Sequence, residues 1–236
     1  MTLAGQSVVV LGGSAGIGLE TARLAQAEGA RVIVNGRDPE RLERAARELG
    51  AAGSAAFDAT DPERLAEFLS GLPEPVDHLL ASGSGPYYAP LAEMDFAEVQ
   101  KDLDQHLLLP LHLGRLAAGR VRGSLTFIGG TGGRRRGVGL TLIGAMTAAM
   151  PAIVENLALE IAPVRVNLVA PGFVDTALSA RLLGDQLEAR REELRRTVPI
   201  GRVVGPVDVA ALVVHLMANT ALTGGTYDVD GGQKLV

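Results

Sequence analysis

Residues 7–20 read SVVVLGGSAGIGLE, an apolar run of strand length that leads directly into a glycine-rich turn and a helical pattern. In a doubly wound sheet, such a turn brings a helix N-terminus and bare backbone N–H groups against a pyrophosphate. Gly12, Gly16 and Gly18 stand where the chain must come close to that group, because glycine has no Cβ. We interpret the stretch as a phosphate-binding turn; a tight turn without a ligand is the alternative.

The same alternation of strand and helix continues along the rest of the chain. Apolar runs of strand length recur, and amphipathic segments at helical spacing lie between most of them. Strands are expected at residues 7–12, 31–36, 54–58, 78–83, 124–130, 164–172 and 226–232, and helices at 16–28, 39–49, 62–69 and 185–196. This order predicts one α/β domain over residues 1–236, a doubly wound parallel sheet with helices on both faces.

Composition narrows the class of protein further. The 236 residues are 47% hydrophobic and 21% charged, with a net charge of −5, so they offer no basic excess for a nucleic-acid partner. The chain has no cysteine, which excludes disulfides and thiolate catalysis. We see no basic leader and expect no uninterrupted apolar run of about 18 residues that could span a bilayer, so we predict a cytoplasmic protein without membrane contact.

The end of the second expected strand indicates which dinucleotide would bind. An acidic residue there would bind the ribose 2′-hydroxyl of NAD, but this chain has Asn35 and Arg37. Arg37 could pair with a 2′-phosphate in a fork geometry, although an exposed surface arginine is the alternative. Asp58 could accept from the adenine amino group or cap the next helix. We therefore predict NADP(H) in preference to NAD(H).

Taken in order, these motifs resemble the short-chain dehydrogenase/reductase family over essentially the whole chain. The matching stretches are LGGSAGIG at 11–18, FDATD at 57–61, VRVNLVAPGFVDT at 164–176 and TGGTYDVDGG at 223–232. The resemblance implies a single Rossmann-type domain, NAD(P)(H) binding, oxidoreductase activity on a small molecule, and a homodimer or homotetramer.

The resemblance also completes the set of residues expected at the cofactor. Pro171 and Gly172 would close the nicotinamide pocket, and Thr176 would contact the phosphate or carboxamide. Together with the residues already named, the predicted cofactor-binding set is Gly12, Ser14, Ala15, Gly16, Ile17, Gly18, Asn35, Arg37, Asp58, Ala81, Ser82, Gly83, Gly130, Pro171, Gly172, Val174 and Thr176.

The expected catalytic residues of that family are missing from this chain. The family protonates an alkoxide with a tyrosine, a lysine, a serine and an asparagine. Matching by spacing places Gly130 at the serine, Ile143 at the tyrosine, Thr147 at the lysine and His106 at the asparagine, and no tyrosine has a lysine four residues later. Residues 81–84, ASGS, replace an Asn-Asn-Ala-Gly stretch. The active site is therefore predicted to be atypical.

Several side chains are candidates to act instead. His106 could donate a proton near neutral pH, although packing in an apolar helix is the alternative. Thr131 and Thr147 could orient a substrate or a water. Residues 134–136, three arginines, could clamp a carboxylate or phosphate of an anionic substrate, with a solvated loop or subunit contact as the alternative. Tyr87 and Tyr88 could reach a substrate from a loop near the cleft.

Three functions stay open at this point. The first is an NADP(H)-dependent oxidoreductase with a non-standard active site, best suited to a substrate that needs no alkoxide proton, such as an activated alkene or imine. The second is a catalytically inactive NADP(H)-binding sensor or partner subunit. The third is a non-redox isomerase or lyase. No residue spacing indicates a metal site, and His78, beside a buried strand, shows no evident partner.

Overall fold

Parallel strands form a single seven-stranded sheet in the computed structural model, which describes residues 2–83, 85–134 and 136–236. The strands are β1 (Ser7–Leu11), β2 (Arg31–Gly36), β3 (Gly53–Ala56), β4 (Val76–Ala81), β5 (Val121–Ile128), β6 (Arg165–Pro171) and β7 (Thr226–Val229). Their order across the sheet is β3-β2-β1-β4-β5-β6-β7. All seven expected strands are therefore confirmed, within a few residues at their ends.

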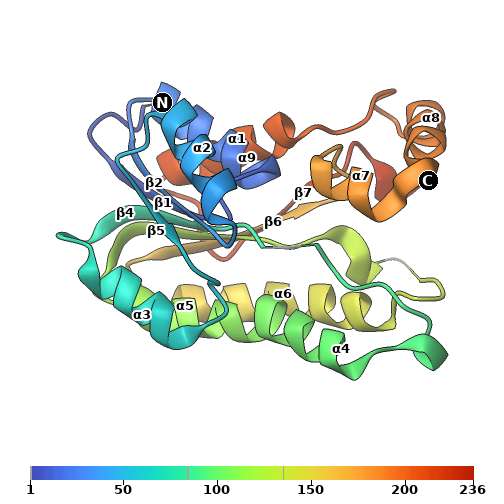
Figure 1. Cartoon of the computed structure of the whole chain (residues 1–236), viewed down its shortest axis with the longest axis horizontal. Helices are drawn as coiled ribbons and strands as arrows, with labels where there is room; N and C mark the ends of the chain where they lie inside the picture. The colour runs from blue at the N-terminus through green and yellow to red at the C-terminus, as the bar shows by residue number, and fades with distance from the viewer. Residues whose placement is uncertain (1, 84, 135) are drawn as a thin grey trace.

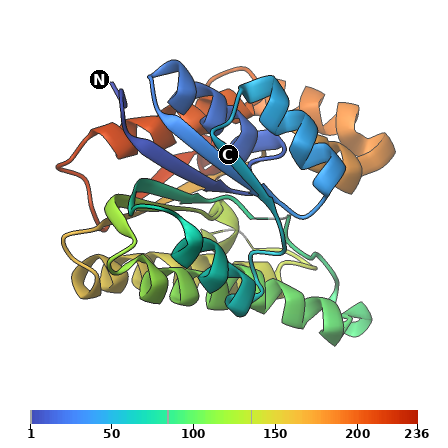
Figure 2. The same cartoon turned by 60° about the vertical axis from the view of Figure 1, so that its left-hand side comes forward.

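Helices cover both faces of this sheet (Figure 1 and Figure 2). Buried side chains of α1, α2 and α9 pack on one face, and those of α3, α5 and α6 pack on the other. The helices are α1 (Gly16–Ala27), α2 (Pro39–Leu49), α3 (Pro62–Gly71), α4 (Phe96–Leu103), α5 (Leu109–Ala117), α6 (Thr141–Glu160), α7 (Ala177–Leu183), α8 (Leu187–Thr197) and α9 (Pro206–Ala218). The predicted single-domain Rossmann-type fold is confirmed.

The strand order reverses at β1, and this reversal positions the site. Leu11, the last residue of β1, pairs with Asn35 of β2 on one side and with Ala81 of β4 on the other. The chain leaves β1 toward one edge of the sheet and returns at β4 toward the opposite edge, which opens a crevice at the carboxyl ends of these strands. The glycine turn lies at this crevice.

Aspartates in the sequence cap two of the helices. Asp38 accepts a hydrogen bond from the Arg41 amide at 3.1 Å, and Asp61 accepts from the amides of residues 63 and 64. Each aspartate precedes a proline in the first helical turn. Asp58 does not cap a helix, since its carboxylate accepts from the amide and hydroxyl of Thr60 instead. The capping alternative for Asp58 is wrong.

Helix α6 corrects one expectation from the sequence. By length and composition alone, this 20-residue helix is long and apolar enough to cross a membrane. The expectation that the chain has no such run is therefore wrong. The helix packs against the sheet through Met150, Val154 and Leu157, which belong to a buried core cluster. The apolar side of this helix covers one face of the sheet, as a parallel sheet buried on both faces requires.

His78 has partners that the sequence did not reveal. It lies within β4, almost wholly buried, with Nδ1 2.8 Å from Ser124 Oγ and Nε2 2.7 Å from Gln6 Oε1. Burial, aided by the nearby Arg165 guanidinium, lowers the pKa of His78 from 6.5 to about 4. The imidazole is therefore neutral at physiological pH and serves the packing between β4 and β5.

Candidate functional site

The glycine turn after β1 is closed by backbone contacts that leave no room for a side chain. Gly12 has a φ of 78°, and a Cβ there would lie 1.9 Å from the Ser82 carbonyl oxygen. A Cβ at Gly18 would lie 2.2 Å from the Gly12 carbonyl oxygen. Helix α1 begins at this turn without a side-chain hydrogen bond to its N-terminal amides. The turn therefore fits a diphosphate, which would accept from those amides.

An open groove of about 200 Å³ runs past this turn along the carboxyl ends of the strands. Most of the predicted cofactor-binding residues line it. These are Gly12, Ser14, Ala15, Gly16, Ile17, Asn35, Arg37, Asp58, Ala81, Ser82, Gly83 and Thr176. The structure thus brings together residues from β1, β2, β4 and the loop before α7, although direct contact of each with a dinucleotide stays a prediction.

The other predicted cofactor residues lie beside the groove without lining it. Gly18 packs behind the turn, and Gly130 lies near Pro171, whose carbonyl oxygen would be 3.7 Å from a Cβ at Gly130. Gly172 lies against Gln233, whose Oε1 would be 2.5 Å from a Cβ there. Val174 forms an isolated bridge with residue 204.

Two arginines line the end of the groove at β2. Arg37 lies 3.9 Å from the Asp58 carboxylate in an exposed pair, and Arg41 lies in the first turn of α2. Asn35 is buried and donates both hydrogens of its side-chain amide to the carbonyls of Ala55 and Phe57. Those hydrogens bind the carbonyls of β3 and of the residue after it, so they are not available to a ligand. Arg37 and Arg41 are the cationic side chains at this end of the groove among the described residues. Arg41, four residues after Arg37, was not among the residues predicted from the sequence to bind the cofactor.

A smaller inner cavity of about 30 Å³ continues from the groove. The two share Ala81, Gly83, Gln105 and Leu109, so the inner cavity lies directly beside the groove. The remaining lining of the inner cavity is mostly apolar: His106, Pro110, Phe127, Ile128, Gly129, Met146, Thr147 and Met150. A cavity of this size holds about two waters, so a substrate must open it or approach it from the groove.

His106 lies on an irregular helical turn at this inner cavity. Residues 104–108 form a π-helix between α4 and α5, and the Leu109 amide donates to the Asp104 carbonyl five residues back. Pro110 has no N–H to donate to the His106 carbonyl, which favours such a widened turn. His106 Nδ1 is 3.0 Å from the Asp102 carbonyl oxygen. Because a carbonyl only accepts, Nδ1 carries a proton, and Nε2 is left to exchange one.

The two threonine candidates differ in their placement. Thr147 lines the inner cavity from α6, and its hydroxyl donates to the Ile143 carbonyl at 2.7 Å. Its proton is thus used within the helix, while its oxygen lone pairs can still accept. Thr131 is buried in the short helix at residues 131–134 and does not line the cavity. Of the two, only Thr147 is placed to orient a substrate.

The arginine-rich loop is held by contacts within the chain. Arg134 makes two hydrogen bonds to the Asp228 carboxylate, which also binds Lys234, and these contacts lower the pKa of Asp228 to about 2. Arg136 donates to the Gly133 carbonyl at 2.8 Å. Arg135, like Ser84 of the ASGS stretch, lies outside the described residues. Arg134 therefore joins this loop to β7 and is not a free clamp for a substrate.

The two tyrosine candidates do not line the cavities described above. The Tyr87 hydroxyl accepts from the Asp95 amide at 2.9 Å, and the Tyr87 amide donates to the Asp102 carboxylate at 2.7 Å. These bonds tie the loop after β4 to α4. Tyr88 is about half exposed. Tyr87 therefore ties the loop after β4 to α4, and its hydroxyl oxygen accepts from the backbone there.

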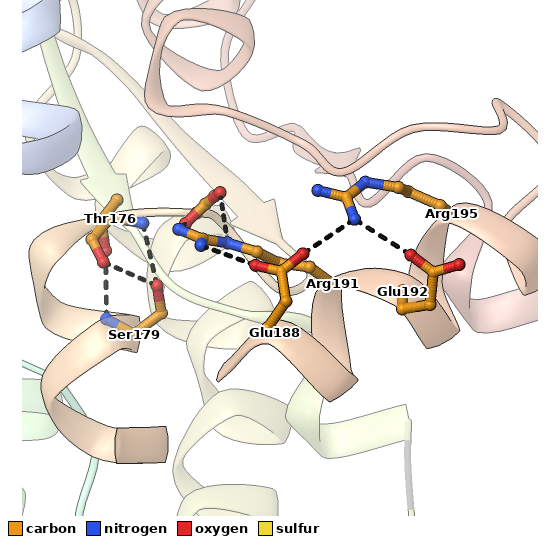
Figure 3. Close-up of polar contacts among 7 residues, drawn as sticks. Thr176, Ser179, Glu188, Arg191, Glu192 and Arg195 are labelled. Atoms are coloured by element: carbon orange, nitrogen blue, oxygen red, sulfur yellow. Dashed lines mark hydrogen bonds and ion pairs between the residues drawn. The ribbon is translucent and has the colours of Figure 1, made fainter. Parts of the chain in front are cut away.

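Helix α7 forms a fixed wall of the groove. Thr176 and Ser179 make reciprocal hydrogen bonds at its N-terminus, and Arg191 of α8 binds Glu188, as Figure 3 shows. Arg191 also donates twice to the Asp175 carboxylate, at 2.9 and 2.8 Å. This capping box and the forked ion pair hold α7 and α8 in place beside the ends of the strands.

Comparisons with known proteins agree with this architecture. A family model described as enoyl-(acyl carrier protein) reductase matches residues 12–234. Short-chain dehydrogenase/reductase ATR9 of Stachybotrys chlorohalonatus is 27% identical, over 99% of both chains. The MalC reductase/Diels-Alderase of Malbranchea aurantiaca superposes with a TM-score of 0.92 at 25% identity, over 99% of this chain and 98% of that one. A small-chain dehydrogenase in complex with NADPH gives 0.84 at 26% identity, over 98% and 99%.

A phosphate-type glycine turn at the switch point of a doubly wound sheet defines a dinucleotide-binding α/β protein. The chain belongs to the short-chain dehydrogenase/reductase family, as the match over residues 12–234 establishes. Its relatives in that family are oxidoreductases.

Proposed function

We propose that this protein is an NADP(H)-dependent oxidoreductase that acts on a small molecule through a non-standard active site. The observation that carries the proposal is the adjacency of two cavities. The groove that holds Arg37, Arg41 and the glycine turn lies beside the inner cavity lined by His106 and Thr147, with four lining residues in common. The structural relative in complex with NADPH supports the choice of cofactor.

Each part of the groove has a distinct role in this proposal. The amides at the start of α1 bind the diphosphate, and Arg37 and Arg41 bind the 2′-phosphate. NADP(H), when bound, supplies or accepts the hydride. His106 exchanges a proton at Nε2 with solvent or substrate, while Thr147 accepts a hydrogen bond from the substrate. The apolar remainder of the inner cavity excludes water around the reacting atoms.

The lining of the inner cavity favours a particular class of substrate. His106 is the one titratable side chain among the described residues that line it. Hydride addition to a ketone or aldehyde leaves a strongly basic alkoxide that needs a proton donor. Addition to an activated alkene leaves a less basic enolate that takes its proton at carbon, and addition to a protonated imine leaves a neutral amine. The matched family model is described as a reductase of enoyl groups, which are activated alkenes. We therefore favour an activated alkene or an imine as substrate.

His106→Ala should lower turnover with NADPH at least about a hundredfold at pH 7, at the low end of what general acid catalysis contributes. The measurement is NADPH oxidation across panels of enones, imines and carbonyl compounds, with the Kd for NADPH determined in parallel and expected to stay within about twofold. His112→Ala, on α5 and outside the cavity lining, is the control. Unchanged turnover in His106→Ala would show that the histidine has no catalytic role.

Arg37→Ala should weaken NADPH binding about tenfold or more and change NADH binding by less than about twofold, because only NADPH carries the 2′-phosphate. Titrations followed by nicotinamide fluorescence compare the two affinities. Arg44→Ala removes an exposed arginine from the same helix as Arg41 and should change neither. Equal losses for both dinucleotides would refute the assignment of Arg37.

The second candidate function is an NADP(H)-binding sensor or partner subunit without turnover. The observation that favours it is the chemistry of the inner cavity, where the Thr147 proton is used by the Ile143 carbonyl and most other lining residues are apolar. Tight NADPH binding without oxidation by any compound of the three panels would support this candidate over the enzyme.

A further inference from the structure

The phosphate turn contains no basic side chain. Residues 12–18 are glycine, serine, alanine and isoleucine, so their backbone amides and the dipole of α1 are the local positive charge. A diphosphate carries two negative charges, and an arginine that reaches it adds charge-assisted hydrogen bonds. Such a cation would have to come from another wall of the groove.

Helix α7 crosses the groove beside this turn. A Cβ at Gly16 would lie 3.6 Å from the Thr176 side chain at the N-terminus of α7. A Cβ at Gly85 would lie 2.9 Å from the Leu178 side chain. Leu178 and Arg181 are three residues apart, so they share one face of the helix, and both line the groove. Arg181 is therefore a cation on the wall that adjoins the turn.

The direction in which side chains leave a helix orients Arg181 toward the glycine turn. Its Cα lies five residues beyond Thr176, about 7.5 Å along the helix axis. The Cα–Cβ bonds of a helix tilt toward its N-terminus, and long side chains extend the same way. From this position an arginine side chain can reach back toward the N-terminus of α7, which lies beside Gly16.

Arg181 is also available for a ligand. It is exposed, and among the described residues it makes no hydrogen bond or ion pair. Its helix is held by the capping box of Thr176 and Ser179 and by the pairing of Asp175 with Arg191 (Figure 3). Only the side chain of Arg181 would need to become ordered on binding, which limits the entropy lost.

We infer that Arg181 binds the diphosphate of the dinucleotide from the wall formed by α7, an inference that rests on the proposed cofactor binding. Its planar guanidinium matches two phosphate oxygens. The cations of the groove then act on different groups of the ligand. Arg37 and Arg41 bind the 2′-phosphate at one end, and Arg181 binds the diphosphate. Arg181 consequently contributes equally to NADPH and NADH.

The test compares three ligands on Arg181→Gln and on the unmodified chain by isothermal titration. NADPH carries both the 2′-phosphate and the diphosphate. NADH carries only the diphosphate, and adenosine 2′-phosphate carries only the 2′-phosphate. We expect Arg181→Gln to weaken NADPH and NADH each about tenfold, as one charge-assisted contact does, and to leave adenosine 2′-phosphate unchanged. Arg196→Gln, which removes an exposed arginine from α8 outside the groove, controls for the change in net charge.

Other results would overturn the inference. NADPH and NADH affinities within about twofold of those of the unmodified chain would show that Arg181 does not contact the diphosphate. An equal loss for adenosine 2′-phosphate would place its action at the 2′-phosphate or in the general field of the groove. If the unmodified chain binds neither dinucleotide, the proposed function itself fails, and this outcome is distinct from the other two.

Discussion

Gly18→Ala should lower the affinity for NADPH at least about a hundredfold, which corresponds to the loss of one or two hydrogen bonds to a charged group. The added Cβ would lie 2.2 Å from the Gly12 carbonyl oxygen, a backbone atom that cannot rotate away. The turn would have to open, and the amides at the start of α1 would lose their common direction. Fluorescence titration with NADPH measures the loss.

Gly71→Ala provides a matched control for this variant. Gly71 is also helical, at the last position of α3, and a Cβ there would meet nothing within 4 Å. We expect NADPH affinity within about twofold of that of the unmodified chain, since the added methyl group occupies open space. Circular dichroism on both variants checks that the fold persists. If Gly18→Ala binds NADPH as Gly71→Ala does, the glycine turn is not the phosphate site.

Lowering the pH from 6.5 to about 4 should remove about 3 kcal/mol of folding free energy through His78. In the folded state the buried imidazole stays neutral until about pH 4, whereas in the unfolded chain it takes up a proton near pH 6.5. The unfolded state therefore binds more protons in this range. The stabilisation is fully present above pH 6.5 and is lost as the pH falls toward 4.

Urea denaturation at several pH values between 7.5 and 4 measures this effect. His78→Gln removes the titrating group, so the pH dependence of its free energy of unfolding should be flatter by about 3 kcal/mol over the same range. His215→Gln, an exposed histidine on α9, should keep the dependence of the unmodified chain. Asp228 does not confuse the comparison, because its pKa is lowered to about 2 and its stabilisation is lost below pH 3.8. Parallel curves for the unmodified chain and His78→Gln would refute the prediction.

The sequence predicted the fold because the signals that carry it are local. The glycine turn follows β1 directly, Asp38 and Asp61 cap the helices that begin at the next residue, and apolar runs mark every strand. It also predicted most of the residues that line the groove, since carboxyl ends of neighbouring parallel strands meet at one edge. The family resemblance placed His106 and Thr147 at catalytic positions, and both line the inner cavity although they lie on different helices.

Other parts of the site depend on contacts between distant residues. The sequence made Arg134 a candidate to bind a substrate, but in the folded chain its guanidinium binds Asp228, 94 positions away. Asn35 stood at the predicted ribose site, yet its amide hydrogens point to carbonyls of β3 and its neighbour. Arg181 belongs to a helix with no motif of its own, and only the packing of α7 over the groove makes it a wall residue. Such pairings have no local signature.

The amino-acid order by itself determined the doubly wound sheet and the place of its phosphate turn, because hydrophobic periodicity, caps and glycine act over a few neighbouring residues. Tertiary structure alone decided which polar side chains remain available at the site. That availability depends on whether another charged or polar group, brought near by folding, has already satisfied each of them.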